Sequence, residues 1–205
     1  MLFALVLAAP LQQPPILRGD ATLSVTTGRV VADDFSFTGR AYNGGAPGPT
    51  LVVRAGHDFT VTLDNTLGPG DVNVTALHLH GLHADPLIET HADGKPRRVE
   101  PGSSLDYSYA LRADHPAGTN WYHPHVYESA AVQQSDGMAG AVIVEDVDPP
   151  AALAAMADVV LVLQHFARYD GNRHKDHIDG SFMPHKQMLT LSHLPKEKNK
   201  SRAPR

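Results

Sequence analysis

Two short motifs carry four imidazole side chains at spacings that suit metal binding. His78 and His80 are separated by one residue, and so are His123 and His125. In an extended strand, residues i and i+2 point to the same face, so each pair projects two rings side by side. Pro124 favours this conformation because proline disfavours helical geometry at the preceding residue. If the two strands are neighbours, the four imidazoles surround one small space, which suits copper, nickel or zinc.

The composition restricts the chemistry that these histidines can share. The chain has 205 residues, 13 of them histidine and none of them cysteine. The lack of a thiol excludes disulfides, zinc–thiolate sites, iron–sulfur clusters and a blue-copper centre within this chain. A formal net charge of -5 and the lack of a basic face predict no nucleic-acid partner. No segment approaches the roughly 20 apolar residues of a membrane-spanning helix.

The segments around the histidines have the pattern of short strands separated by glycine, proline and asparagine. Some of these runs alternate apolar and polar residues, as half-buried strands do, and others are continuously apolar. Strands are expected over residues 51–54, 59–63, 105–111 and 141–144. Helical periodicity is nearly absent between Ala21 and Asp146. The pattern predicts an all-β, antiparallel Greek-key β-sandwich.

A change in composition at Asp148–Pro150 predicts a domain boundary. Beyond it we expect a short helical turn within residues 151–157 and an apolar strand over Val159–Leu163. The last residues, 195–205, are basic and too polar to bury enough surface to become ordered. The segment after the boundary is short for another sandwich domain, so the chain is expected to be cut short there.

Longer segments around the histidine pairs resemble the multicopper oxidase family, which includes laccases and ferroxidases. Matching segments occur in the family's order from about Tyr42 to Asp146. They are Tyr42–Thr50 (YNGGAPGPT), Arg54–Asp58 (RAGHD), Leu77–Leu82 (LHLHGL), Pro101–Ser103 (PGS), Thr119–His125 (TNWYHPH) and Asp136–Gly140 (DGMAG). The resemblance implies a plastocyanin-like (cupredoxin) domain, the first domain of such an oxidase.

The resemblance also implies roles for the histidines. His78 would bind the type 2 copper of a trinuclear cluster, and His80, His123 and His125 would each bind one of the paired type 3 coppers. In the family this cluster reduces dioxygen to water with electrons from a type 1 copper, which a cysteine in a later domain binds. Because only neutral imidazole binds a metal, copper affinity is expected to collapse below about pH 6.

The sequence departs from the family after Val147. The later His-x-His-Gly and His-Cys-His motifs are missing, while residues 158–169 resemble the opening of the family's second domain. Oxidase catalysis is therefore expected only if further domains, a partner subunit or an oligomer complete the cluster. The alternatives are a stand-alone copper-binding module and a non-catalytic cupredoxin interaction module.

These observations predict a division of the chain into three parts. Residues 1–20 form an apolar N-terminal arm or the remnant of a signal peptide, because Leu2–Ala9 is apolar but too short to span a bilayer. Residues 21–148 form the cupredoxin domain, and residues 149–205 form the start of a second domain with a basic, disordered tail. The protein is expected to be secreted or periplasmic.

Other polar and aromatic residues are assigned ordinary roles. Exposed positions are expected for His83, His91 and His115, turn chemistry for His57, and a loop for His174 and His177. Asp85, Glu89 and Asp93 are interpreted as a solvated acidic loop. Trp121 is expected to pack in the core.

Overall fold

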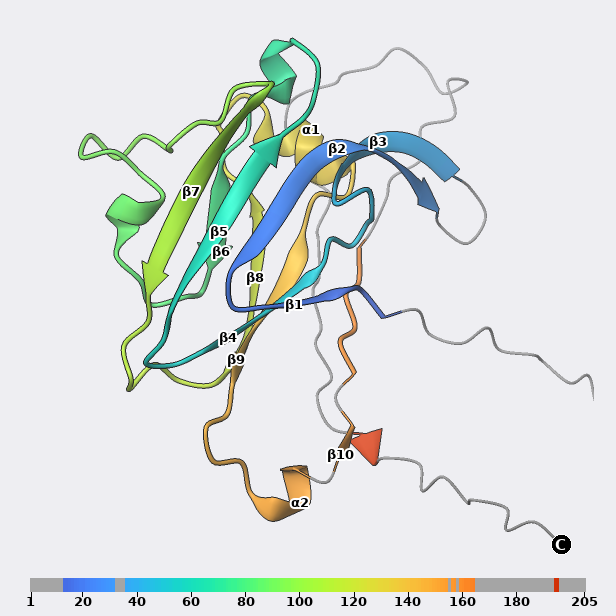
Figure 1. Cartoon of the computed structure of the whole chain (residues 1–205). Coiled ribbons are helices and arrows are strands. Elements are labelled where there is room, and N and C mark those ends of the chain that lie inside the picture. The colour runs from blue at the N-terminus through green and yellow to red at the C-terminus, as the bar shows by residue number, and fades with distance from the viewer. Residues whose placement is uncertain (1–12, 32–35, 155, 158, 165–193, 196–205) are drawn as a thin grey trace, which may run out of the picture.

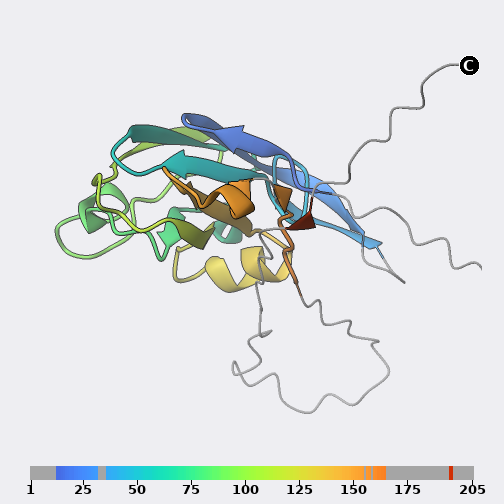
Figure 2. The same ribbon diagram turned by 90° about the horizontal axis from the view of Figure 1, so that it is seen from below.

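The computed structural model describes residues 13–31, 36–154, 156–157, 159–164 and 194–195. Two β-sheets pack face to face in this part of the chain, and Figures 1 and 2 show the two layers. The apolar run Leu2–Ala9, the basic residues 196–205 and the pair His174 and His177 lie outside the described residues. No helix in the described ranges has both the length and the apolar character needed to cross a membrane.

Four of the strands in the two sheets coincide with the runs predicted at residues 51–54, 59–63, 105–111 and 141–144. The first sheet has the strand order β1-β4-β9-β8-β6. Its strands are β1 (Ile16–Arg18), β4 (Thr50–Arg54), β9 (Gly140–Glu145), β8 (Gly118–Pro124) and β6 (Leu77–His80). The second sheet has the order β3-β2-β5-β7. Its strands are β3 (Ser36–Tyr42), β2 (Ala21–Val31), β5 (Asp58–Asn65) and β7 (Ser103–Ala110).

The predicted fold class, an all-β cupredoxin-like sandwich, is confirmed, but the sheets are mixed rather than wholly antiparallel. Strand β4 runs parallel to both β1 and β9, and β2 runs parallel to β5. The chain changes sheets between β4 and β5, which follow each other directly. Apolar–polar alternation fixes which face of a strand is buried and carries no information on the direction of its neighbour. The antiparallel expectation was therefore wrong for these pairs.

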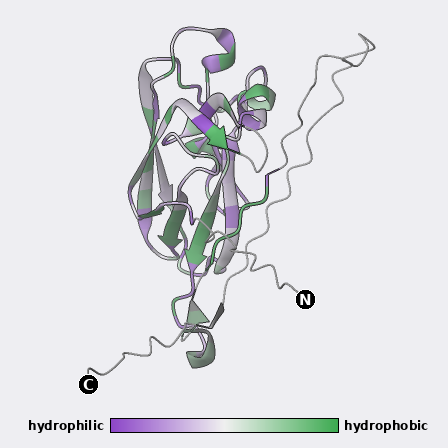
Figure 3. Cartoon of the chain, turned by 90° about the vertical axis from the view of Figure 1, so that its right-hand side faces the viewer, coloured by the Kyte–Doolittle hydropathy of each residue, from purple (hydrophilic) through white to green (hydrophobic). Residues whose placement is uncertain are grey.

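The core lies between the sheets, and alternation along the strands supplies it. In β5, Phe59, Val61 and Leu63 are buried while the intervening residues are more exposed. The mixed colours along the strands in Figure 3 show the same interleaving of hydrophobic and hydrophilic residues. Burial of each such side chain contributes about 1.5–3 kcal/mol to folding, before the entropy cost of ordering the chain.

The buried tyrosine of β8 lies in a space left by two glycines. Tyr122 is fully buried, and its hydroxyl donates a hydrogen bond to the Pro49 carbonyl at 2.8 Å. A Cβ atom added at Gly140 would lie 2.3 Å from the Tyr122 ring, and one at Gly48 would lie 2.5 Å from its hydroxyl oxygen. The absence of side chains at both glycines lets the tyrosine pack directly against the backbone of β9.

A short helix, α1 (Ala130–Ser135), was not predicted, because six residues are too few for a visible helical period. Gln133 of α1 is fully buried. Its amide group donates to the carbonyls of Val72 and Val74, and its side-chain oxygen accepts from Thr75 Oγ1. The helix thereby joins the chain after β8 to the segment that leads into β6. Strands β6 and β8 belong to the two histidine motifs.

The segment after β9 agrees only partly with expectation. Helix α2 (Ala151–Ala154) occupies the predicted helical turn and precedes the two-residue strand β10 (Met156–Ala157), which pairs with β11 (Leu194–Pro195). The strand predicted over Val159–Leu163 is wrong, because residues 159–164 have no strand structure. The backbone N–H of Val160 donates to the Gln13 side chain rather than to a sheet.

Candidate metal centre

His78 and His80 of β6 and His123 of β8 lie on adjacent antiparallel strands at the edge of the first sheet, and His125 directly follows β8. In the pairing of β6 with β8, His78 is opposite His123 and His80 is opposite Trp121. These side chains share the outer face, whereas Leu79 points into the core and is 2% exposed. The prediction that the histidines project together from neighbouring strands is confirmed for His78, His80 and His123.

Three of the four rings bring their nitrogens close together. His78, His80 and His123 each offer one nitrogen, and these atoms lie within 4.8 Å of one another. Within this group, His80 Nδ1 lies 3.4 Å from His123 Nε2. His125 lies beside this group, with its ring centroid 4.9 Å from that of His78 and 5.8 Å from that of His123.

Hydrogen bonds to the second nitrogen orient two of the rings. His123 Nδ1–H donates to the Pro124 carbonyl at 2.9 Å, which leaves Nε2 free to face His80. His78 Nδ1–H donates to Glu89 Oε2 at 2.5 Å, which leaves its Nε2 free. Imidazoles that bind metals usually hold their second nitrogen in this way. The donor set therefore fits a metal ion bound by neutral imidazole.

The electrostatic environment favours the neutral form of the His123 and His125 rings, which is the form that binds metal. Burial lowers the pKa of His123 to about 4, and the neighbouring histidines reinforce the shift. Burial also lowers the pKa of His125. Because His123 stays neutral well below pH 6, the loss of copper expected near that pH does not begin at this residue.

Glu89, expected in a solvated acidic loop, is instead the centre of a buried hydrogen-bond network. Its side chain is 14% exposed. Besides contacting His78, the carboxylate accepts hydrogen bonds at Oε1 from the Leu79 backbone N–H and the Tyr109 hydroxyl, both at 2.9 Å. Burial alone would raise the pKa of Glu89, but these hydrogen bonds outweigh it and lower the pKa. Glu89 is therefore a carboxylate held against the candidate site.

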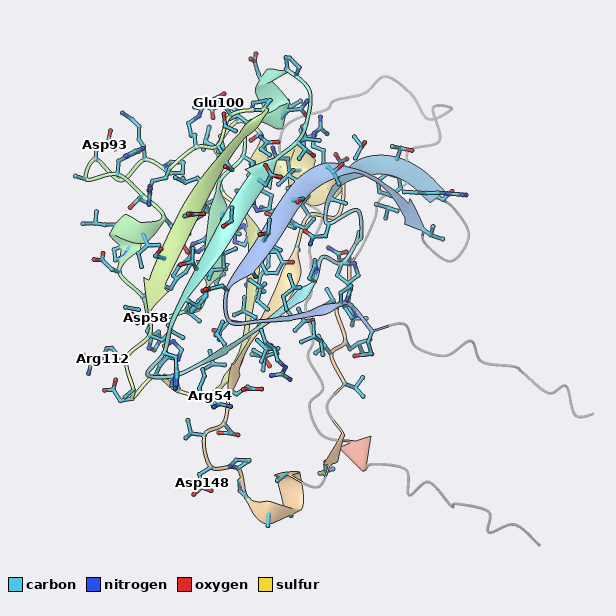
Figure 4. The ribbon with its side chains drawn as sticks, viewed as in Figure 1. Arg54, Asp58, Asp93, Glu100, Arg112 and Asp148 are labelled. Atoms are coloured by element: carbon cyan, nitrogen blue, oxygen red, sulfur yellow. The ribbon has the colours of Figure 1, made fainter. Side chains whose placement is uncertain are left out.

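The other two acids of this loop are exposed, as expected. Asp93 lies at the outer tip of the loop in Figure 4 and pairs with Lys95. Asp85 caps the short helix η2 (Pro86–Ile88), because its side chain accepts a hydrogen bond from the Leu87 N–H. The Asp-Pro start of this helix was the one local signal that the loop turns back before Glu89.

Trp121 was expected in the core, and this prediction was wrong. Its ring centroid is 4.2 Å from that of His123 and 5.1 Å from that of His80, with interplanar angles of 30° and 25°. The strand period of two, which placed His123 and His125 on one face, also places Trp121 on that face. The tryptophan therefore packs beside the imidazoles on the outer face of the sheet.

His115 was expected to be exposed but is 7% exposed, because both ring nitrogens are used by the surrounding backbone. Its Nδ1–H donates to the Pro116 carbonyl at 2.8 Å, and its Nε2 accepts from the His83 N–H at 3.0 Å. His115 therefore holds the loop after β6. His83 and His91 are exposed as predicted, and His57 lies next to a turn as predicted.

A family model described as multicopper oxidase matches residues 24–149, more than half of the chain. The chain belongs to the multicopper oxidase family. Family membership implies that it binds copper, and the histidine cluster described above is the candidate copper site.

Curated relatives in the multicopper oxidase family are more than a third identical to this chain over the matched residues. An iron transport multicopper oxidase of Gibberella zeae is 39% identical over 126 residues, which are 59% of this chain and 18% of the relative. A multicopper oxidase of Staphylococcus aureus is 36% identical over 106 residues, which are 51% of this chain and 22% of the relative. The chain thus spans about a fifth of the length of these relatives.

Solved structures of the family share the sandwich. A laccase-like multicopper oxidase from an Ochrobactrum species superposes with a TM-score of 0.58 at 28% identity, covering 67% of this chain and 30% of that protein. A multicopper oxidase from Pseudomonas thermotolerans superposes with a TM-score of 0.53 at 31% identity, covering 66% and 31%.

A cavity of about 220 Å³ adjoins the histidine face of this multicopper oxidase domain. His78, His125 and Glu89 line it together with apolar residues of β6 and the following loop. His80 and His123 do not line it and instead face each other.

We expect Glu89→Gln to weaken copper binding by about 10–100-fold, the usual cost of removing a partner of a ligating histidine. The glutamine amide can donate as well as accept a hydrogen bond, and it lacks the negative charge that stabilises a nearby cation. Equilibrium dialysis against a copper buffer measures the affinity. Asp93→Asn removes an exposed acid from the same loop and should leave the affinity unchanged; an equal loss in both variants would show that only loop charge matters.

Proposed function

We propose that this domain holds copper through His78, His80, His123 and His125 and forms half of the trinuclear type 2/type 3 cluster of a multicopper oxidase. The observation that carries the proposal is the register of β6 and β8, which gathers the histidines of both motifs on one face. The fixed second nitrogens of His78 and His123 support it, because they aim the free nitrogens away from the protein backbone.

The spacing of the rings supports the assignment of different histidines to different copper ions. Nitrogen ligands lie about 2.0–2.1 Å from a bound ion such as zinc, so two of them on one ion are at most about 4.2 Å apart. His80 Nδ1 and His123 Nε2, 3.4 Å apart, meet this limit and would share one type 3 ion. His125 would bind the other type 3 ion and His78 the type 2 ion, both beside the cavity that they line.

In the complete cluster, copper would supply the electron transfer that reduces dioxygen to water, and this chain would hold and orient the ions. Four histidines are too few to complete three coordination spheres, and the chain has no cysteine for a type 1 site. Further domains or a partner subunit would supply both, whereas an oligomer of this chain would supply only further histidine ligands. We therefore expect no phenol oxidation by the isolated chain.

A copper titration tests the proposal, with Trp121 as the reporter because it is the only tryptophan and lies against two of the rings. Bound Cu(II) should quench its fluorescence, and the metal should remain bound after desalting at neutral pH. Fluorescence that is unaffected by copper, together with copper-free protein after desalting, would contradict the proposal.

We also propose the division into residues 1–20, 21–148 and 149–205, with residues 21–148 as the cupredoxin domain, to whose first sheet β1 adds an edge strand. A secreted or periplasmic location is proposed on the apolar run Leu2–Ala9. Protease digestion followed by mass spectrometry tests the division, which requires a resistant fragment that ends near Asp148.

A further inference from the structure

Strand β7 belongs to the sheet opposite the histidines, yet two of its side chains reach across the sandwich. Tyr107 and Tyr109 are two residues apart, share the inner face and are at most 1% exposed. The Tyr109 hydroxyl donates to Glu89 Oε1 at 2.9 Å. The Tyr107 hydroxyl donates to the Arg97 carbonyl at 2.7 Å and so holds the far end of the same loop.

The contacts of Glu89 link Tyr109 to the histidine cluster. One carboxylate oxygen accepts from Tyr109, and the other accepts from His78 Nδ1. We propose that Tyr109 is a positioning residue for the copper site: its hydroxyl fixes the Glu89 carboxylate, which in turn fixes the tautomer and orientation of the His78 ring. This inference rests on the proposed function of the histidines as copper ligands.

The surroundings of Tyr109 make it a rigid donor. Phe59 stacks on its ring with centroids 5.0 Å apart and an interplanar angle of 14°. Burial raises the pKa of Tyr109 far above its usual value, and the Glu89 charge adds to the shift, so the hydroxyl keeps its proton. A glutamate side chain has several rotatable bonds, and without this donor only the Leu79 N–H would hold Oε1.

The position of the Glu89 carboxylate matters for the metal because His78 can bind through Nε2 only while Nδ1 carries the hydrogen. The carboxylate selects that tautomer. A carboxylate free to rotate would let the His78 ring turn and exchange tautomers. We therefore expect the loss of the Tyr109 hydroxyl to act on copper through Glu89 and His78, without direct contact with the ion.

The test compares Tyr109→Phe with Tyr122→Phe, since each removes one buried hydroxyl and one hydrogen bond. Tyr122 donates to the Pro49 carbonyl and makes no contact with Glu89. Tyr109→Phe should weaken Cu(II) affinity about 3–10-fold, less than the loss of the direct partner. Tyr122→Phe should leave it within twofold while lowering the thermal midpoint similarly. Equal affinities for the two variants would overturn the inference.

A double-mutant cycle separates positioning from general destabilisation. In the Glu89→Gln background, Tyr109→Phe should cause no further loss of affinity, because the path to His78 is already altered. A full additional 3–10-fold loss there would show that Tyr109 acts independently of Glu89.

Nitrogen NMR of the copper-free chain tests the inference without the metal. The His78 ring should be a single Nδ1–H tautomer in the parent and in Tyr122→Phe, and a mixture in Tyr109→Phe. An unchanged tautomer in Tyr109→Phe would overturn the inference. If the parent binds no copper while the tautomer changes as expected, the proposed function fails and the Tyr109–Glu89–His78 linkage stands.

Discussion

Replacing His78 and His123 together by alanine should abolish copper retention by the purified chain. The two residues are directly opposite each other in the pairing of β6 with β8, and they supply two of the three nitrogens that cluster within 4.8 Å. The remaining rings, His80 and His125, would be left without a shared partner. Copper per chain after desalting at neutral pH measures the loss, and quenching of Trp121 fluorescence follows it during titration.

The matched control for this variant is His83→Ala combined with His91→Ala. Both residues are exposed, and both lie in the loop after β6, outside the cluster. The control should retain the parent's copper content, and circular dichroism should show that both double variants fold. Equal copper content in the His78/His123 variant and the parent would rule out these residues as the ligands.

Gly140→Ala should destabilise the sandwich by about 1–3 kcal/mol or more, the range seen when a packed core is overfilled. The added methyl carbon would lie 2.3 Å from the Tyr122 ring, which is fully buried and has nowhere to move. Relief requires a shift of β8 or β9, and these strands carry and flank the second histidine pair. Urea denaturation measures the change in the free energy of unfolding.

Gly68→Ala is the control for the general effect of glycine replacement. A methyl group at Gly68 would meet no atom within 4 Å, and its backbone lies outside the left-handed region. This variant should be within about 0.5 kcal/mol of the parent, as surface substitutions usually are. If Gly140→Ala proved as stable as Gly68→Ala, close packing of Tyr122 against β9 would not hold in solution.

The histidine cluster could be predicted from the sequence because its signal is local. The strand period of two places His78 with His80 and His123 with His125, and in the structure the rings of each pair lie next to each other. The same rule applied one step further would have placed Trp121 on the histidine face rather than in the core. The apolar character of tryptophan favours a core position, but its position in the strand decides the face on which it lies.

Glu89 and Tyr109 could not be predicted, because their contact depends on distant parts of the chain. Glu89 lies in a loop whose composition is that of a solvated surface, and Tyr109 is on the opposite sheet. Their hydrogen bond follows from the packing of the two sheets and from the way the loop turns back after η2. The parallel strand pairs were missed for a similar reason, since strand direction is decided by long-range topology.

Anomalous diffraction at the copper absorption edge, recorded from copper-loaded crystals of this chain, tests the central claim most directly. We expect anomalous peaks about 2.0–2.1 Å from imidazole nitrogens, the usual metal–imidazole distance, with one peak between His80 and His123. Peaks only at exposed histidines such as His57 or His91, with no copper between β6 and β8, would contradict the assignment of these histidines as a copper half-site.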